Sequence, residues 1–176
     1  MKLPRALPFL LAFVLPLVVV YAWWGGFNPI EVERTTRPAR TYAYLEQRGD
    51  YGKLPELQNR VHGLLAVQGV ASGAAITLLY DDPARVPAPA RRARTGYVVA
   101  ADAAVREPLV LGRVEAGPVR VARVRAAAML APSRIYQALD ERLRAEGRGF
   151  RMPTVEIFET SGSVFRMGVL SVEMEE

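Results

Sequence analysis

The feature that most constrains the fold is an internal repeat. Segments of the two halves match at a constant spacing of 78 positions, the distance from Tyr80 to Phe158. In chain order, 41–45 matches 119–123, 57–65 matches 135–143, Gly69 matches Gly147, and 78–81 matches 156–159. After a connection that is shorter by six residues, 94–98 matches 166–170. A register shared by several kinds of segment indicates a duplicated unit.

The repeated pattern predicts the elements of each half. Apolar residues recur at helical spacing in the first half and at the matching positions of the second: Leu57, Val61, Leu65, Ile135, Leu139 and Leu143. Gly69 and Gly147 follow these stretches, where a helix commonly ends in a glycine. Each half, about 30–100 and 108–172, is predicted to run strand, helix, strand, strand. Extra leading strands are predicted at 30–34 and near 109–114.

These units predict an α+β domain of two duplicated βαββ units with a mainly antiparallel sheet and one helix per half. A single helix covers one face of a small sheet, so neither half alone builds much core. We therefore expect the halves to associate about a pseudo-twofold axis and to leave a cleft between them.

The amino terminus is predicted to be a membrane anchor. No charged residue occurs from Ala6 to Trp24, and such a run approaches the roughly 20 residues needed to cross a bilayer. We expect a single-pass transmembrane helix within 1–26, followed by one domain over 27–176, and thus a membrane localisation. A cleaved signal peptide ending at Ala22 is the alternative. Basic residues flank both sides of the run, so its orientation stays open.

The formal charge of +5 does not indicate nucleic-acid binding. Lys2 and Lys53 are the only lysines, and the remaining positive residues are arginines spread among Ala, Pro and Val. The densest basic run, 91–94, has no interleaved aromatic residue on which a base could stack. The chain has no cysteine, so disulfides are excluded.

Glu156 is the residue most indicative of function. In the strand-like stretch 154–159, side chains alternate, so Glu156 and Phe158 share one face. The repeat offset puts Leu78 and Tyr80 on the equivalent face, and Tyr42 and Tyr44 share a face of the preceding strand. The candidate ligand-binding residues are therefore Glu156, Phe158, Tyr80, Leu78, Tyr42 and Tyr44. Such a cleft would favour flat, apolar or cationic small molecules.

Alternatives to this site remain open. Glu156 could lie on a solvated face of the sheet, or its burial could raise its pKa and make it a general acid or base. His62 is the only histidine and has no second ligand nearby, so no metal is expected. Ser161 and Ser163 have no base partner, so no nucleophilic catalysis is expected. No phosphate-binding glycine loop occurs, and no cofactor is expected.

The duplicated unit with Glu156-Ile157-Phe158 near its end resembles the gyrase-inhibitor-like (GyrI-like) small-molecule-binding domains. The resemblance covers roughly 30–172. Tyr80-Asp81-Asp82-Pro83 with Val86-Pro87, Arg92 and Gly96 is similar in spacing to a membrane-anchored animal member of the family, a testis-expressed reticulophagy receptor. The resemblance implies a ligand cleft with Glu156 as the cation-facing carboxylate. Phe158 stands where the family usually has tyrosine.

Three functions are consistent with this pattern. The first is a membrane-anchored module that binds small apolar or cationic ligands between the two repeats. The second is a protein-interaction scaffold or receptor at the membrane, with an unknown partner. The third is a small hydrolase that uses Glu156. We also expect Arg92 to pair with Asp81 or Asp82 and hold the loop after 78–81 in place.

Overall fold

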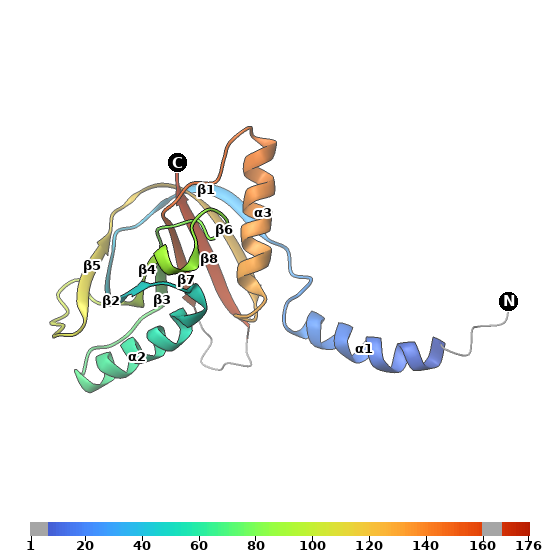
Figure 1. Cartoon of the computed structure of the whole chain (residues 1–176), viewed down its shortest axis with the longest axis horizontal. Coiled ribbons are helices and arrows are strands. Elements are labelled where there is room, and N and C mark those ends of the chain that lie inside the picture. Colours follow the sequence, from blue (N-terminus) through green and yellow to red (C-terminus); the bar gives the residue numbers. More distant parts are fainter. Residues whose placement is uncertain (1–6, 160–166) are drawn as a thin grey trace.

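The computed structural model describes residues 7–159 and 167–176 (Figure 1). Its helices are α1 (Leu7–Trp23), α2 (Leu54–Val67) and α3 (Ala131–Ala145), with short 3-10 turns at Tyr51–Lys53 and Ala88–Ala90. Its strands are β1 (Glu31–Arg37), β2 (Arg40–Arg48), β3 (Ala75–Leu79), β4 (Arg92–Val98), β5 (Val110–Val114), β6 (Gly117–Ala126), β7 (Thr154–Glu159) and β8 (Gly168–Glu175).

All eight strands form one antiparallel sheet in the order β1-β6-β8-β7-β3-β4-β2-β5. The order strand, helix, strand, strand occurs twice along the chain, as β2-α2-β3-β4 and as β6-α3-β7-β8. The two sets meet at the centre of the sheet, where β3 pairs with β7. The middle of the sheet therefore belongs equally to both halves of the chain.

The leading strand of each half lies at the edge of the other half. β1 precedes β2 in the chain but pairs only with β6, whereas β5 precedes β6 but pairs only with β2. Only Pro38 and Ala39 connect β1 to β2, although these strands lie near opposite ends of the sheet order. So short a connection requires a strongly curled sheet whose two ends approach each other.

The helices α2 and α3 cover one face of this sheet. α2 packs on β2 and β4 through Val61 and Leu65, and α3 packs on β6 and β8 through Ile135, Leu139 and Leu143; these five side chains are fully buried. A proline in the first turn of each helix is compatible with the unpaired N–H groups there. Gly69 and Gly147 have φ values of +69° and +67°, which confirms both predicted helix ends.

A second core lies on the opposite, inward face of the curled sheet. It is formed by buried side chains of four strands, namely Tyr42, Tyr44, Ile76, Leu78, Val114, Val155 and Ile157. Because the two faces are both buried near β3, all five residues of that strand, Ala75–Leu79, are buried. This strand therefore has no polar alternation that would mark one of its faces as exposed.

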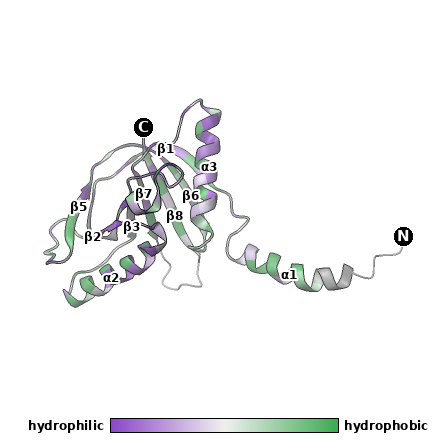
Figure 2. Cartoon of the chain, in the orientation of Figure 1, coloured by the Kyte–Doolittle hydropathy of each residue, from purple (hydrophilic) through white to green (hydrophobic). Residues whose placement is uncertain are grey.

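The predicted fold class needs correction at the amino terminus. Helix α1 contains 17 residues, includes Pro16 and extends away from the sheet (Figure 1), and the part of it that Figure 2 colours is mainly hydrophobic. Within residues 7–159 and 167–176, no helix has both the length and the apolar character required to cross a bilayer. The predicted transmembrane helix and the single-pass membrane localisation are therefore wrong, and nothing among the described residues supports the predicted membrane contact through residues 6–24. The fold is α+β, with an eight-stranded antiparallel sheet and three helices among the described residues.

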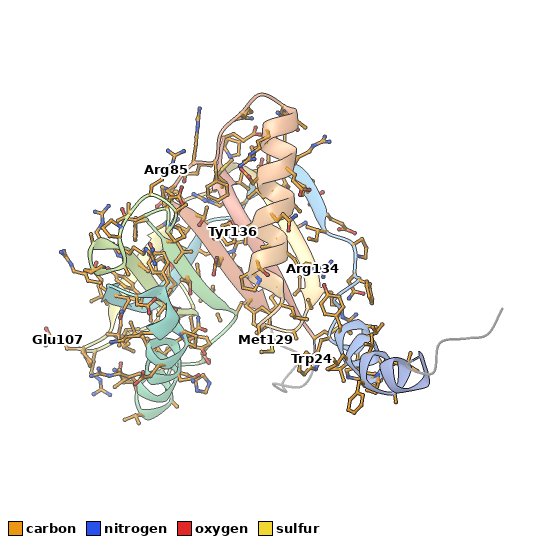
Figure 3. The ribbon with its side chains drawn as sticks, turned by 45° about the vertical axis from the view of Figure 1, so that its right-hand side comes forward. Trp24, Arg85, Glu107, Met129, Arg134 and Tyr136 are labelled. Atoms are coloured by element: carbon orange, nitrogen blue, oxygen red, sulfur yellow. The ribbon has the colours of Figure 1, made fainter. Side chains whose placement is uncertain are left out.

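The segment after α1 is attached to the body by α3. Arg134 donates hydrogen bonds of 2.6 Å to the carbonyl oxygens of Gly25 and Asn28, and the Ala127 amide donates to the Trp24 carbonyl at 2.9 Å. Figure 3 labels Trp24 and Arg134 on the two sides of this contact. The contact fixes the start of the folded body, and it lies apart from the centre of the sheet.

Candidate functional site

A pocket of about 350 Å³ lies over the centre of the sheet, on the face that carries α2 and α3. One wall comes from the first turn of α2 and the turn before it, including Tyr51 and Gln58. The opposite wall includes Pro132, at the start of α3. The floor comes from the central strands and includes Thr77 and Glu156. We call this pocket the central cleft; it draws residues from both halves of the chain.

Glu156 lies on β7 at the floor of the central cleft and is partly buried. Its Oε1 accepts a hydrogen bond of 2.7 Å from the Tyr136 hydroxyl, which projects from α3. The Tyr136 oxygen also lies 3.0 Å from Thr154 Oγ1. A phenol has one proton, so when Tyr136 donates to Glu156 the Thr154 hydroxyl donates to Tyr136. The carboxylate is thus held by a two-step hydrogen-bond chain.

The surroundings raise the pKa of Glu156. Burial disfavours the charged carboxylate and raises this pKa, while the hydrogen bond from Tyr136 partly offsets the effect. Burial, together with the nearby Glu156 charge, also raises the pKa of Tyr136 well above 10.0. Tyr136 therefore remains a hydrogen-bond donor over the whole range in which Glu156 titrates.

None of the described residues that line the central cleft is basic, so none of them balances Glu156. Among the described residues that line it, Glu156 is the only charged group. Three other polar side chains bond to one another: Thr77 and Thr95 share a hydrogen bond of 2.8 Å, and Gln58 donates to Thr95 at 3.2 Å. The site therefore presents one carboxylate in a largely neutral and apolar setting.

Phe158 lies beside Glu156 in the same pocket. Its ring packs over the start of β8, where a Cβ on Gly168 would lie 2.5 Å from Phe158 Cζ. Glycine at this position gives the ring the space it occupies. The hydroxyl that the family resemblance places on the residue at 158 is absent, and Tyr136 supplies a hydroxyl to Glu156 from the helix instead.

The other four predicted site residues lie on the opposite face of the sheet. Tyr42, Tyr44 and Leu78 belong to the inward core, and Tyr80 packs against it. Where β3 pairs with β7, Thr77 lies opposite Glu156 and Leu78 lies opposite Val155. The predicted common face for Leu78, Tyr80 and Glu156 is therefore wrong. The offset of 78 shifts these strands by one residue, and a shift of one residue exchanges the two faces.

The aromatic residues of the inward face pack around the guanidinium group of Arg94, a side chain of the protein itself. The guanidinium carbon of Arg94 lies 4.7 Å from the ring centre of Tyr44 and 5.5 Å from that of Tyr80. Arg94 also donates to Glu46 at 3.0 Å. Burial raises the pKa of Tyr42, in the same cluster, to about 12. The aromatic cluster thus holds an internal arginine.

Several smaller predictions can be compared with the structure. Arg92 pairs with Asp81 through hydrogen bonds of 3.0 and 3.1 Å, as the hypothesis for this loop proposed. His62 packs on the ring of Tyr97, and no group of three or more metal-ligating side chains occurs within the described part of the chain. Ser161 and Ser163 lie outside the described residues, as does Arg166, the first residue of the repeat match at 166–170.

Sequence reasoning missed the residues that complete the cleft, above all Tyr136. It follows the core residue Ile135 directly, so the helical pattern alone does not distinguish a core position from a cleft position. Thr77 was missed because of the one-residue strand shift. Tyr51 was missed because its hydroxyl bonds to the Asp81 and Arg92 carbonyls only after the chain folds.

No family model and no curated protein sequence matches the chain. Solved structures do match. The C-terminal domain of EcmrR gives a TM-score of 0.61 at 10% identity, over 84% of this chain and 99% of that one. The structure of EcmrR in a complex with DNA gives a TM-score of 0.63 at 9% identity, over 98% of this chain and 67% of that one.

Two further structures have the same fold. SAV2435 bound to tetraphenylphosphonium gives a TM-score of 0.52 at 10% identity, over 82% of this chain and 92% of that one. A hydrolase from Listeria innocua gives a TM-score of 0.50 at 11% identity, over 84% of this chain and 93% of that one. Identities this low show the fold alone. The fold is consistent with the GyrI-like architecture that the sequence resemblance implied.

Proposed function

We propose that the chain is a ligand-binding module that takes a small, apolar, cationic molecule into the central cleft. The observation that carries this proposal is the setting of Glu156, a partly buried carboxylate with no basic side chain among the described residues of its pocket. A carboxylate removed from water is costly unless a positive charge accompanies it. A cationic ligand would supply that charge.

The remainder of the central cleft suits the apolar part of such a ligand. Its volume of about 350 Å³ falls within the range of small-molecule sites. Leu54, Pro132 and Leu170 offer apolar contacts, and Phe158 offers a ring beside the carboxylate. Aromatic rings attract cations through their negative faces, so Phe158 and Glu156 favour the same kind of ligand.

The comparison with SAV2435 is consistent with this proposal, because that structure is bound to tetraphenylphosphonium. The proposed ligand contacts are narrower than those expected from the sequence. Glu156 and Phe158 remain, and Tyr136 joins them as the donor to the carboxylate. Tyr42, Tyr44, Leu78 and Tyr80 are left out because they lie on the inward face.

The proposal is tested by binding of tetraphenylphosphonium to the full chain, measured by isothermal titration calorimetry. We expect saturable binding to one site and a loss of about tenfold or more in affinity for Glu156→Gln, because the amide keeps the size of the side chain but not its charge. Glu159→Gln is the matched control, since Glu159 is exposed at the end of the same strand. Equal affinities of the two variants would reject the cleft as the binding site.

A further inference from the structure

A second pocket adjoins the central cleft. It has a volume of about 700 Å³ and lies between α3 and the segment Asp82–Arg85, which follows β3. Leu79, at the end of β3, lines both pockets. We call it the loop pocket. Figure 3 labels Tyr136, a residue of α3, and Arg85, on the loop.

The interior of the loop pocket is apolar and aromatic. Leu79, Tyr136, Phe150 and Met152 line it. The rings of Tyr136 and Phe150 lie 5.6 Å apart at an angle of 51°. Aromatic rings pack well in tilted arrangements of this kind, and a methionine sulfur contacts ring edges favourably. These groups favour an aromatic guest.

The charged side chains of the loop pocket already have partners. Asp82 pairs with Arg85 at 3.4 Å, and Asp140 pairs with Arg144 at 2.8 Å. Arg148 pairs with Glu176, outside the pocket, at 3.2 Å. A charged guest would have to compete with one of these pairs, whereas a neutral guest would leave all of them intact. The loop pocket therefore favours a neutral group, in contrast to the central cleft.

Tyr136 connects the two pockets. Its ring lines the loop pocket, while its hydroxyl donates to Glu156 in the central cleft. Tyr51, which lines the central cleft, accepts a bond from the Asp81 amide at 3.3 Å and donates to the backbone at the base of the loop. The wall of one pocket and the loop of the other are thus held together.

We propose that the loop pocket binds the neutral aromatic end of an elongated ligand whose cationic end faces Glu156. The inference rests on the proposed function of the central cleft. The ligand class is an aryl-alkyl cation, in which a short flexible chain joins a bulky cationic group to a neutral ring. The shared residue Leu79 and the bridging residue Tyr136 mark where the chain passes from one pocket to the other.

The experiment compares two phosphonium ions on the full chain by calorimetry, methyltriphenylphosphonium and phenylpropyltriphenylphosphonium. Both carry the same cationic head, and only the second carries an additional ring. We expect the phenylpropyl ion to bind about tenfold or more tightly, because burial of the chain and ring adds apolar contact. Ala84→Trp should fill the loop pocket and abolish this gain without changing the affinity for the methyl ion.

Two further variants make the result specific. Phe150→Ala should reduce the gain by enlarging the pocket, and Ala66→Trp, an exposed position near the end of α2, controls for the addition of a surface tryptophan. If Ala84→Trp still bound the phenylpropyl ion as much more tightly than the methyl ion as the wild-type chain does, the loop pocket would not be the site that binds the additional ring. Failure of the proposed function would show differently, as unchanged affinity for both ions in Glu156→Gln.

Discussion

Glu156 experiences two opposing influences on its pKa. Burial raises this pKa, and the hydrogen bond from Tyr136 lowers it, with burial the stronger of the two. A carboxyl group is neutral below its pKa and negative above it. The attraction of the central cleft for a cation is therefore expected to grow as the pH rises through the raised pKa of Glu156.

This balance gives a prediction for Tyr136→Phe. The variant removes the bond that stabilises the ionised carboxylate, so the pKa of Glu156 should rise further. The pH at which tetraphenylphosphonium affinity is half-developed should then shift upward relative to the wild-type chain. Calorimetric titrations between about pH 4 and pH 9 measure this shift.

Tyr97→Phe is the control for the loss of a tyrosine hydroxyl. Tyr97 packs on His62 beside α2 and does not line the central cleft. Its pH profile should match that of the wild-type chain. An affinity that does not vary with pH in the wild type would contradict a titrating Glu156 as the countercharge.

At the scale of the elements, the sequence predicts helices better than strand faces. The spacing of 78 aligns Val61 with Leu139 and Leu65 with Leu143, and all four side chains are buried. A helix repeats every 3.6 residues and presents a broad apolar stripe, whereas a strand alternates at every residue. The same spacing therefore gave correct helices but exchanged the faces of β3.

Two other features were beyond reach of the sequence pattern for physical reasons. All residues of β3 are buried and four of the five are apolar, so Thr77 was the single indication of which face would meet the cleft. The role of Tyr136 depends on how α3 crosses β7, which is a result of tertiary packing. Glu156 was identifiable because a charged residue between apolar neighbours is unusual in a central strand.

The end of α3 is held by a charged cluster whose pH dependence can be predicted. Arg120, buried on β6, donates two hydrogen bonds of 2.8 and 2.6 Å to the carboxylate of Glu146. These bonds lower the pKa of Glu146 from 4.5 to about 2. Because the folded-state pKa lies below the ordinary value, the stabilisation is present above pH 4.5 and is lost as the pH falls toward 2.

We expect the urea midpoint of the wild-type chain to fall over this pH interval and that of Glu146→Gln to fall less, since the amide does not titrate. At neutral pH the variant should be less stable, because buried Arg120 loses one of its two charged partners and keeps only Glu176. Asp140→Asn is the control, as its pair with Arg144 on the surface of α3 contributes little. Parallel pH profiles for all three proteins would contradict this account.

At the scale of the whole molecule, an ion pair crosses the inside of the curled sheet. Arg40 on β2 lies 3.1 Å from Glu173 on β8, although three strands separate them in the sheet order. The Glu173 side chain is only 4% exposed and Arg40 is 22% exposed. The pair joins the two halves across the inward face.

Glu173→Gln should therefore destabilise the fold by about 2–4 kcal/mol, since it leaves a largely buried guanidinium without a counter-charge. Glu115→Gln, which alters an exposed pair with Arg113, should change stability by less than about 0.5 kcal/mol. Both should unfold in a single transition, because the halves share one sheet. Equal urea midpoints for the two variants would show that the crossing pair contributes nothing.

The reciprocal placement of β1 and β5 has a consequence for how such a molecule could be assembled from smaller parts. A chain that carried one βαββ unit with its leading strand would leave that strand unpaired, and would leave a free edge where the other unit's strand belongs. Two identical copies could satisfy each other by trading these strands. In such a dimer the central cleft would exist only at the subunit boundary, so a ligand of that cleft could bind only to the assembled pair.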